Sequence, residues 1–191
     1  MSYKIAIIGL GYVGFPLAYE FSKKFDVIGF DLSKKRINEL TSGYDVTNEI
    51  KSEDLDIAKD KIFLTDDIQE LKSCNIYIIT VPTPVDESNI PDTSFLKKAS
   101  KNVGSIIKKG DMIIYESTVY PGATEEICIP LLEETSNLIF NEDFYVGYSP
   151  ERINPGDKTH TLPQIKKLVS ASTEESLEKI FCPTLCIFGD L

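Results

Sequence analysis

Three glycines near the start of the sequence, Gly9, Gly11 and Gly14, have the spacing G-x-G-x-x-G. In such a motif the first glycine permits a tight turn, the second lets the backbone approach a pyrophosphate, and the third lets a helix pack closely against a strand. The N-terminus of that helix offers free N–H groups and a positive dipole end to phosphates. The same spacing also occurs in glycine-rich turns that bind nothing, so the surrounding residues must distinguish the two interpretations.

The residues around these glycines favour phosphate binding. Ile5–Ile8 is an unbroken apolar run, which is typical of a strand buried on both faces of a parallel sheet. Residues 15–21 follow with helical spacing, and a second apolar run, Val27–Phe30, ends in Asp31. Asp31 comes roughly 20 residues after the motif begins, where an acidic residue binds the ribose hydroxyls of an adenine dinucleotide. The motif and its context therefore predict a dinucleotide-binding loop.

Two further polar side chains, Thr118 and Glu151, follow apolar runs that we predict to be strands. The carboxyl ends of parallel strands meet at one edge of a sheet, so both side chains are expected at the edge that carries the glycine loop. There a carboxylate could act as a general base and a hydroxyl could orient a water molecule. Two plainer interpretations remain open from the residues alone. Glu151 could be a surface carboxylate paired with Arg152, and Thr118 could cap a helix.

Apolar runs typical of strands alternate with helical patterns along the chain, which predicts an α/β fold. We expect a Rossmann-like, doubly wound and mostly parallel sheet with helices on both faces. The expected strands cover residues 5–8, 27–30, 62–64, 76–79, 112–115, 144–148 and 168–170. The expected helices cover residues 15–21, 33–40, 54–59, 66–72, 93 or 94 to 108, 124–134 and 174–181. Pro82 and Pro84 end the fourth strand abruptly and stiffen its exit, whether or not they also face a ligand.

The composition is that of one ordinary globular domain, with 191 residues, 42% hydrophobic and 26% charged. The net charge of −10 argues against nucleic-acid binding and against anionic membrane surfaces. The first residues run straight into a strand and no apolar run is long enough to span a bilayer, so we expect a cytoplasmic protein without membrane contact. Its four cysteines and its one histidine, His160, show no metal-binding spacing, so we expect no metal and reduced thiols.

Four segments together resemble the N-terminal domain of the UDP-glucose/GDP-mannose dehydrogenase family. They are residues 9–18 (GLGYVGFPLA), 81–84 (VPTP), 115–122 (YESTVYPG) and 147–157 (GYSPERINPGD). The likeness covers about residues 3–180, and its later motifs are far more specific than the glycine loop. The chain is most similar to the branch that oxidises UDP-N-acetylhexosamines, such as UDP-N-acetylgalactosamine or UDP-N-acetylglucosamine, in bacterial surface-polysaccharide and capsule synthesis.

The resemblance implies two successive NAD-linked oxidations at C6 of the sugar, from an alcohol to a carboxylate. In the family a cysteine, a lysine and an aspartate from beyond the first domain take part, and the Cys-Phe-Pro-Lys context of that cysteine does not occur in this sequence. We therefore expect residues 1–181 to form an NAD-binding domain and residues 182–191 to be a tail that departs from the family pattern. The central helix and the substrate domain are expected to be absent, and the parent protein to be a homo-oligomer.

The resemblance also implies roles for particular residues. The implied pyrophosphate loop consists of Gly9, Gly11, Tyr12, Val13 and Gly14, with Asp31 at the ribose, Arg36 near the adenine end, and Thr83 and Thr118 at the cofactor. The implied catalytic residues are Thr118, which positions a water molecule, and Glu151, a base in thioester hydrolysis. The implied contacts to the UDP-sugar are Glu151, Arg152 and Asn154.

Some alternatives stay open at this point. Asp31 favours NAD over NADP because a carboxylate repels a 2′-phosphate, although Lys34, Lys35 and Arg36 could in principle hold one. The parent protein could instead be a UDP-glucose 6-dehydrogenase of the same family, or the chain could be an NAD-binding module without turnover of its own. A different Rossmann dehydrogenase, acting on a hydroxy acid or on 6-phosphogluconate, would leave the segment PERINPGD (150–157) unexplained.

Overall fold

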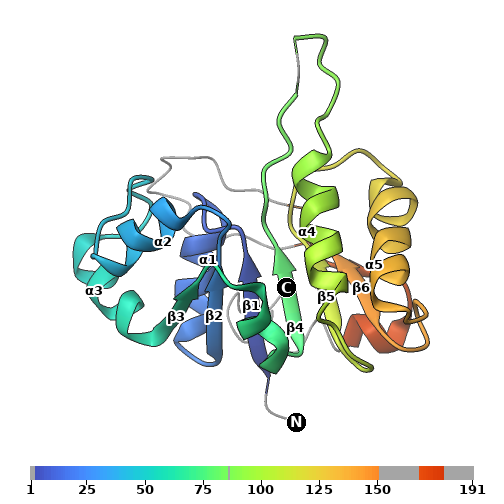
Figure 1. Cartoon of the computed structure of the whole chain (residues 1–191), viewed down its shortest axis with the longest axis horizontal. Helices are drawn as coiled ribbons and strands as arrows, with labels where there is room; N and C mark the ends of the chain where they lie inside the picture. The colour runs from blue at the N-terminus through green and yellow to red at the C-terminus, as the bar shows by residue number, and fades with distance from the viewer. Residues whose placement is uncertain (1–2, 86, 151–167, 179–191) are drawn as a thin grey trace.

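The computed structural model describes residues 3–85, 87–150 and 168–178, and the structural statements below refer to these residues. Within them lies a seven-stranded sheet with the order β3-β2-β1-β4-β5-β6-β7 (Figure 1). The strands are β1 (Lys4–Ile8), β2 (Asp26–Phe30), β3 (Ile62–Thr65), β4 (Ile76–Ile79), β5 (Met112–Tyr115), β6 (Tyr145–Tyr148) and β7 (Ser170–Ala171). The pairings from β3 to β6 are parallel, and β7 pairs antiparallel with β6. The predicted Rossmann-like, mostly parallel sheet is confirmed.

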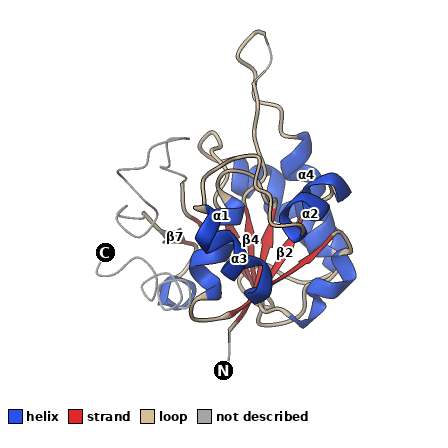
Figure 2. Ribbon diagram, turned by 90° about the vertical axis from the view of Figure 1, so that its left-hand side faces the viewer, coloured by secondary structure: helices blue, strands red, loops and turns tan. Residues whose placement is uncertain are grey.

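Helices cover both faces of this sheet (Figure 2). One face packs against α1 (Gly14–Ser22), α2 (Lys34–Thr41) and α3 (Ser52–Lys61). The other face packs against the 3-10 helix η1 (Ile68–Ser73), α4 (Ser94–Gly104), the π-helical turn η2 (Thr124–Cys128) and α5 (Ile129–Ser136). This is the doubly wound arrangement that the alternating sequence pattern predicts.

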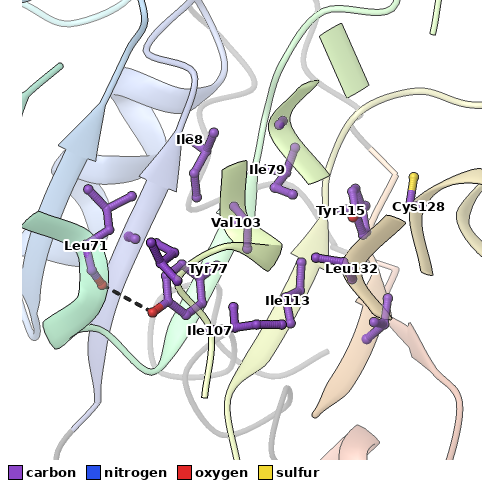
Figure 3. Close-up of a cluster of buried hydrophobic side chains, with 14 of the residues drawn as sticks. Ile8, Leu71, Tyr77, Ile79, Val103, Ile107, Ile113, Tyr115, Cys128 and Leu132 are labelled. Carbon is purple, nitrogen blue, oxygen red and sulfur yellow. Dashed lines mark hydrogen bonds between the residues drawn. The ribbon is translucent and has the colours of Figure 1, made fainter. Parts of the chain in front are cut away.

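The unbroken apolar run of β1 supplies both cores, because alternate side chains of a strand point to opposite faces. Ile5 and Ile7 belong to the core cluster on the α1 face, whereas Ile8 belongs to the cluster on the α4 face. Figure 3 shows this second cluster, in which the Tyr77 hydroxyl donates a hydrogen bond of 3.2 Å to the carbonyl of Leu71. Burial raises the pKa of Tyr77, so the phenol stays a neutral donor.

The helix expected to reach residue 108 is shorter in the structure, since α4 ends at Gly104. A Cβ atom at Gly104 would overlap Thr135 Oγ1 and approach the backbone of Leu132, so α4 and α5 are in close contact at this point. Beyond Gly104 the chain turns, and Ile106 and Ile107 enter the second core cluster. Burial of these two side chains thus takes precedence over continuation of the helix.

Other boundaries also differ from the expectation. The strand expected at residues 168–170 is β7, which is only two residues long and antiparallel, too short for any alternation to be visible in the sequence. The helix expected at 124–134 begins with the π-helical turn η2 and continues to Ser136, where Asn137 at φ +57° ends it. The helix expected at 66–72 is the 3-10 helix η1, capped by Asp67. Of the helix expected at 174–181, residues 174–178 are helical and the remainder lies outside the described residues.

The strand order positions the site, because β1 lies between β2 on one side and β4 on the other. Ligands of open α/β sheets bind outside the carboxyl ends of the strands at such a reversal of order. The glycine loop after β1, Asp31 after β2 and the exits of β4 and β5 all lie at this edge. Among the described residues, no helix has the length and apolar character needed to cross a membrane.

Candidate functional site

A cavity of about 780 Å³ opens at the carboxyl edge of the sheet, above β1 and β4. Its walls include eight of the residues singled out from the sequence: Gly9, Gly11, Tyr12, Val13, Asp31, Arg36, Thr83 and Thr118. Gly14 lies directly behind the loop, at the first position of α1. Glu151, Arg152 and Asn154 lie outside the described residues, so their roles remain predictions.

The three motif glycines have different surroundings. Gly9 has φ +97°, a conformation that side chains other than glycine rarely adopt. A Cβ atom at Gly14 would overlap the carbonyl oxygen of Gly9 and the hydroxyl of Thr80, so no larger residue fits there. A Cβ atom at Gly11, by contrast, would meet no atom of the described chain within 4 Å. Gly11 therefore has open space beside it in the cavity wall, where a ligand can approach the backbone.

Asp31 holds the turn after β1 and keeps capacity for a ligand. Its Oδ2 atom accepts a hydrogen bond of 2.8 Å from the backbone N–H of Leu10, and its Oδ1 atom accepts one of 2.8 Å from Ser33. Each carboxylate oxygen has two lone pairs, so each can accept one further hydrogen bond, such as one from a ribose hydroxyl. Because Asp31 lines the cavity, its geometry fits the ribose-binding role that the sequence predicts.

Each of the three basic residues after Asp31 has an acidic partner within the chain. Lys34 Nζ lies 3.5 Å from Asp66, and Lys35 Nζ lies 3.7 Å from Glu39. The guanidinium of Arg36 is buried, with Nε donating a hydrogen bond of 2.7 Å to the carbonyl of Leu10 and Nη2 lying 2.7 Å from Asp45 Oδ1. Arg36 thus contacts two partners within the chain, and its Nη1 atom is buried with no hydrogen-bond partner among the described residues.

Three hydroxyls connect the loops that form the cavity. Thr80 donates to the carbonyls of Gly9 at 2.7 Å and Ile8 at 3.1 Å, which joins the exit of β4 to the glycine loop. Ser117 donates to the carbonyl of Val81 at 2.6 Å, and Thr83 donates to the carbonyl of Thr118. The exits of β4 and β5 are therefore held to each other in both directions.

Sequence reasoning missed several of these contributors, namely Thr80, Ser117 and Asp45. The available signal for Thr80 and Ser117 is that each is a hydroxyl residue at the carboxyl end of an apolar run. Nothing in the local sequence distinguishes Asp45 from the other acidic residues of its segment, because its partner Arg36 belongs to the preceding helix.

The two cysteines within the described residues, Cys74 and Cys128, are buried away from the cavity. Burial raises the pKa of each thiol to about 11, which keeps both protonated and unreactive near neutral pH. No group of three or more metal-binding side chains occurs in the part of the chain that the structure describes. The chemistry that these residues support is the binding of a dinucleotide.

Comparison with known proteins agrees with this geometry. The sequence profile described as "UDP-glucose/GDP-mannose dehydrogenase family, NAD binding domain" matches residues 3–183. A UDP-N-acetyl-D-glucosamine 6-dehydrogenase of Pseudomonas aeruginosa is 56% identical over 177 residues, which are 93% of this chain and 42% of that protein. Protein CapL of Staphylococcus aureus is 52% identical over 178 residues, with the same shares covered, 93% and 42%.

Solved structures lead to the same family. A UDP-D-ManNAc dehydrogenase from Pyrococcus horikoshii superposes with a TM-score of 0.88 at 31% identity, over 97% of this chain and 45% of that one. The present chain spans 42% of the length of the relative from Pseudomonas aeruginosa. The matched profile covers nearly the whole chain and contains the glycine loop, Asp31 and the β4 and β5 exits. The chain therefore belongs to the UDP-glucose/GDP-mannose dehydrogenase family and is an NAD-binding domain of that family.

Proposed function

We propose that this chain is the NAD-binding part of a nucleotide-sugar 6-dehydrogenase that oxidises the C6 alcohol of a UDP-N-acetylhexosamine to a carboxylate in two NAD-dependent steps. The observation that supports it best is the single cavity into which the glycine loop, Asp31 and the exits of β4 and β5 all open. Two relatives that bear the names of UDP-N-acetylhexosamine dehydrogenases support the substrate class. The product class, and the name of CapL, support a role in surface-polysaccharide or capsule synthesis.

The walls of the cavity suggest how NAD lies in it. The carboxylate of Asp31 would accept hydrogen bonds from the adenosine ribose, and the backbone of residues 11–13 would face the pyrophosphate. The nicotinamide end would then reach the loops that carry Thr83 and Thr118, which are held together by the Thr83 hydroxyl. Bound there, NAD supplies the hydride acceptor for C6. In this arrangement the Thr118 hydroxyl orients a water molecule, while Glu151 acts as a base and Arg152 and Asn154 contact the UDP-sugar.

The proposal divides the work between this chain and the rest of the parent protein. Cys74 and Cys128 are buried and protonated, so neither can form a thioester with the sugar aldehyde. We therefore assign the thiol, the lysine and most of the sugar pocket to a later domain, as the family resemblance implies. We place the parent protein in the cytoplasm, where NAD and UDP-sugars are available, as a homo-oligomer.

Calorimetry and absorbance test the proposal together. Titration of the 191-residue chain with NAD should give saturable binding, and absence of binding would contradict the proposal. The parent protein should release two NADH per sugar from UDP-N-acetylglucosamine or UDP-N-acetylgalactosamine. Its Glu151→Gln variant should stall at the thioester. Steady turnover by the isolated chain would show that the thiol is one of the four cysteines present here and would refute the division of work.

A further inference from the structure

Leu10, the residue between the first two motif glycines, is fixed at both of its backbone polar groups. Its N–H donates to Asp31 Oδ2 at 2.8 Å, and its carbonyl accepts from Arg36 Nε at 2.7 Å. Its side chain is fully buried in the core under α1. The two peptide groups that flank Leu10 are therefore fixed in orientation. The second of them contains the N–H of Gly11, so the orientation of that N–H is fixed as well.

Arg36 is itself held in place by a third residue, Asp45. The ion pair between Arg36 Nη2 and Asp45 Oδ1 is 2.7 Å long, and the two side chains are only 9% and 2% exposed. Asp45 lies in the segment between α2 and α3, and its carboxylate also accepts hydrogen bonds from the N–H of Thr47 at 3.1 Å and from its hydroxyl at 2.8 Å. A buried carboxylate carries a desolvation cost, which the ion pair with Arg36 and the hydrogen bonds from Thr47 together offset.

The contacts of Asp45 reach the cavity by two routes. Through Arg36 they fix the Leu10 carbonyl, and through the hydrogen bonds from Thr47 they hold a residue that lines the same cavity. Asp45 itself does not line the cavity. Asp45 can therefore affect a bound dinucleotide only indirectly, through the glycine loop that Arg36 holds and through Thr47 in the cavity wall.

We propose that Asp45 is a positioning residue for NAD: its ion pair with Arg36 holds the Leu10 peptide, and thereby the pyrophosphate-facing backbone, in the binding conformation. The inference rests on the proposed binding of NAD along the glycine loop. It assigns Arg36 a role through the loop, in addition to its place near the adenine end. Pre-organisation of this kind strengthens binding because the loop is already ordered when the ligand arrives.

The test compares three variants of the full 191-residue chain. Asp45→Asn removes the charge that pairs with Arg36 but keeps an oxygen for the Thr47 hydrogen bonds. Arg36→Lys keeps a cation for Asp45 but removes the planar Nε–H that bonds Leu10. Asp54→Asn is the matched control, because Asp54 is also a carboxylate that joins two elements, accepting a 2.7 Å hydrogen bond from Tyr19, but it lies outside the cavity wall.

Two measurements are made on each folded variant: NAD affinity by calorimetry, and amide hydrogen exchange of residues 9–14 without NAD. Asp45→Asn and Arg36→Lys should each weaken NAD binding about ten-fold, the scale of one lost charge-assisted hydrogen bond, and should speed exchange in residues 9–14. Asp54→Asn should change neither measurement. Should Asp45→Asn not fold, Arg36→Lys alone decides the question, since it leaves no unpaired buried charge.

The possible failures are distinguishable. If the unsubstituted chain does not bind NAD, the proposed function is wrong, and the exchange of residues 9–14 still decides whether Asp45 orders the loop. If the chain binds NAD but Asp45→Asn and Arg36→Lys bind it as tightly, the inference is wrong and the proposed function stands. Equal weakening by Asp54→Asn would also overturn the inference, because it would show a general loss of stability.

Discussion

The hydroxyl of Thr80, at the exit of β4, donates a hydrogen bond of 2.7 Å to the carbonyl of Gly9, at the exit of β1. The same hydroxyl occupies the space that a Cβ atom of Gly14 would need. The carbonyl of Gly9 and the hydroxyl of Thr80 together explain why a helix can begin so close to the turn only if its first residue is glycine. The two central strands and the first helix meet at this one side chain.

Replacement of Thr80 tests this connection. Thr80→Val keeps the shape of the side chain but removes both hydrogen bonds to the turn, so the free energy of unfolding should fall by about 1–3 kcal/mol, the cost of leaving a buried polar group unsatisfied. Thr80→Ser keeps the hydroxyl and should recover most of the loss. Urea denaturation followed by circular dichroism measures both. Equal stability of the valine variant and the unsubstituted chain would show that the hydrogen bonds of Thr80 do not stabilise the turn.

Gly11 offers a second test, because its surroundings contain no chain atoms to clash with. Gly11→Val should leave the fold largely intact and abolish NAD binding, since its side chain would occupy the space that the pyrophosphate needs. Gly14→Ala is the contrasting variant: it forces an overlap with Gly9 and Thr80 and should destabilise the fold itself, by about 1–3 kcal/mol. Calorimetry and thermal melting separate the two effects. Normal NAD binding by Gly11→Val would show that the loop is assigned wrongly.

The carboxylate of Asp31 should decide between NAD and NADP. Calorimetry with both cofactors should show tighter binding of NAD, because the carboxylate accepts from the 2′-hydroxyl and repels a 2′-phosphate. Asp31→Ala should weaken NAD binding by about 1–3 kcal/mol, the scale for hydrogen bonds to a charged group. Part of this loss would come from the freed N–H groups of Leu10 and Ser33, so Asp31→Asn is the informative companion. Tighter binding of NADP by the unsubstituted chain would contradict the assignment.

The buried thiols predict a loss of stability in alkali. Burial raises the pKa of Cys74 and Cys128 from 9.0 to about 11, so the folded chain binds these protons more tightly than the unfolded chain does. The stability linked to them is complete below pH 9.0 and is lost as the pH rises through about 11. A Cys74→Ala/Cys128→Ala double variant should show a shallower decline in urea stability between pH 9.0 and about pH 11, the window that the shifted pKa values set.

A thiol reagent gives an independent check of the same two residues. At roughly pH 8 a Cys182→Ser/Cys186→Ser variant should react slowly with a disulfide reagent when folded and completely in denaturant, because only the thiolate attacks. Rapid reaction of the folded variant would show that Cys74 or Cys128 is accessible.

The sequence predicts the sheet well because each strand of a buried parallel sheet is an apolar run, and Ile5–Ile8 and Ile76–Ile79 are buried throughout or nearly so. It predicts β7 poorly because two residues that pair at the sheet edge carry no periodic pattern. α4 ends at Gly104 because Ile106 and Ile107 are buried in the second core cluster, and Gly104 itself contacts α5, more than twenty positions further along the chain. Tertiary packing of this kind overrides local helical preference.

The candidate site, like the fold, could be predicted from the sequence only in part. The glycine spacing and Asp31 can be predicted from the sequence because the motif is local and its chemistry follows from residue type. The partners of Arg36 cannot be predicted in this way, because Leu10 lies 26 residues away and Asp45 is one of many acidic residues in the chain. Contacts between segments so far apart in the sequence can be identified only from the folded structure, in which the strand exits lie side by side.

The cavity is bounded by residues 31–33, 36, 46 and 47 on one side of β1, and by residues 80–84, part of α4 and residues 116–118 on the other. A molecule that contacts both walls is released when either side of the sheet opens, so its binding adds to the cooperativity of unfolding. The added stability grows as RT ln(1 + [L]/Kd), about 2.7 kcal/mol when the ligand is at roughly 100 times its Kd. The midpoint of thermal unfolding would therefore report occupancy of this cavity directly, with no substrate and no turnover required.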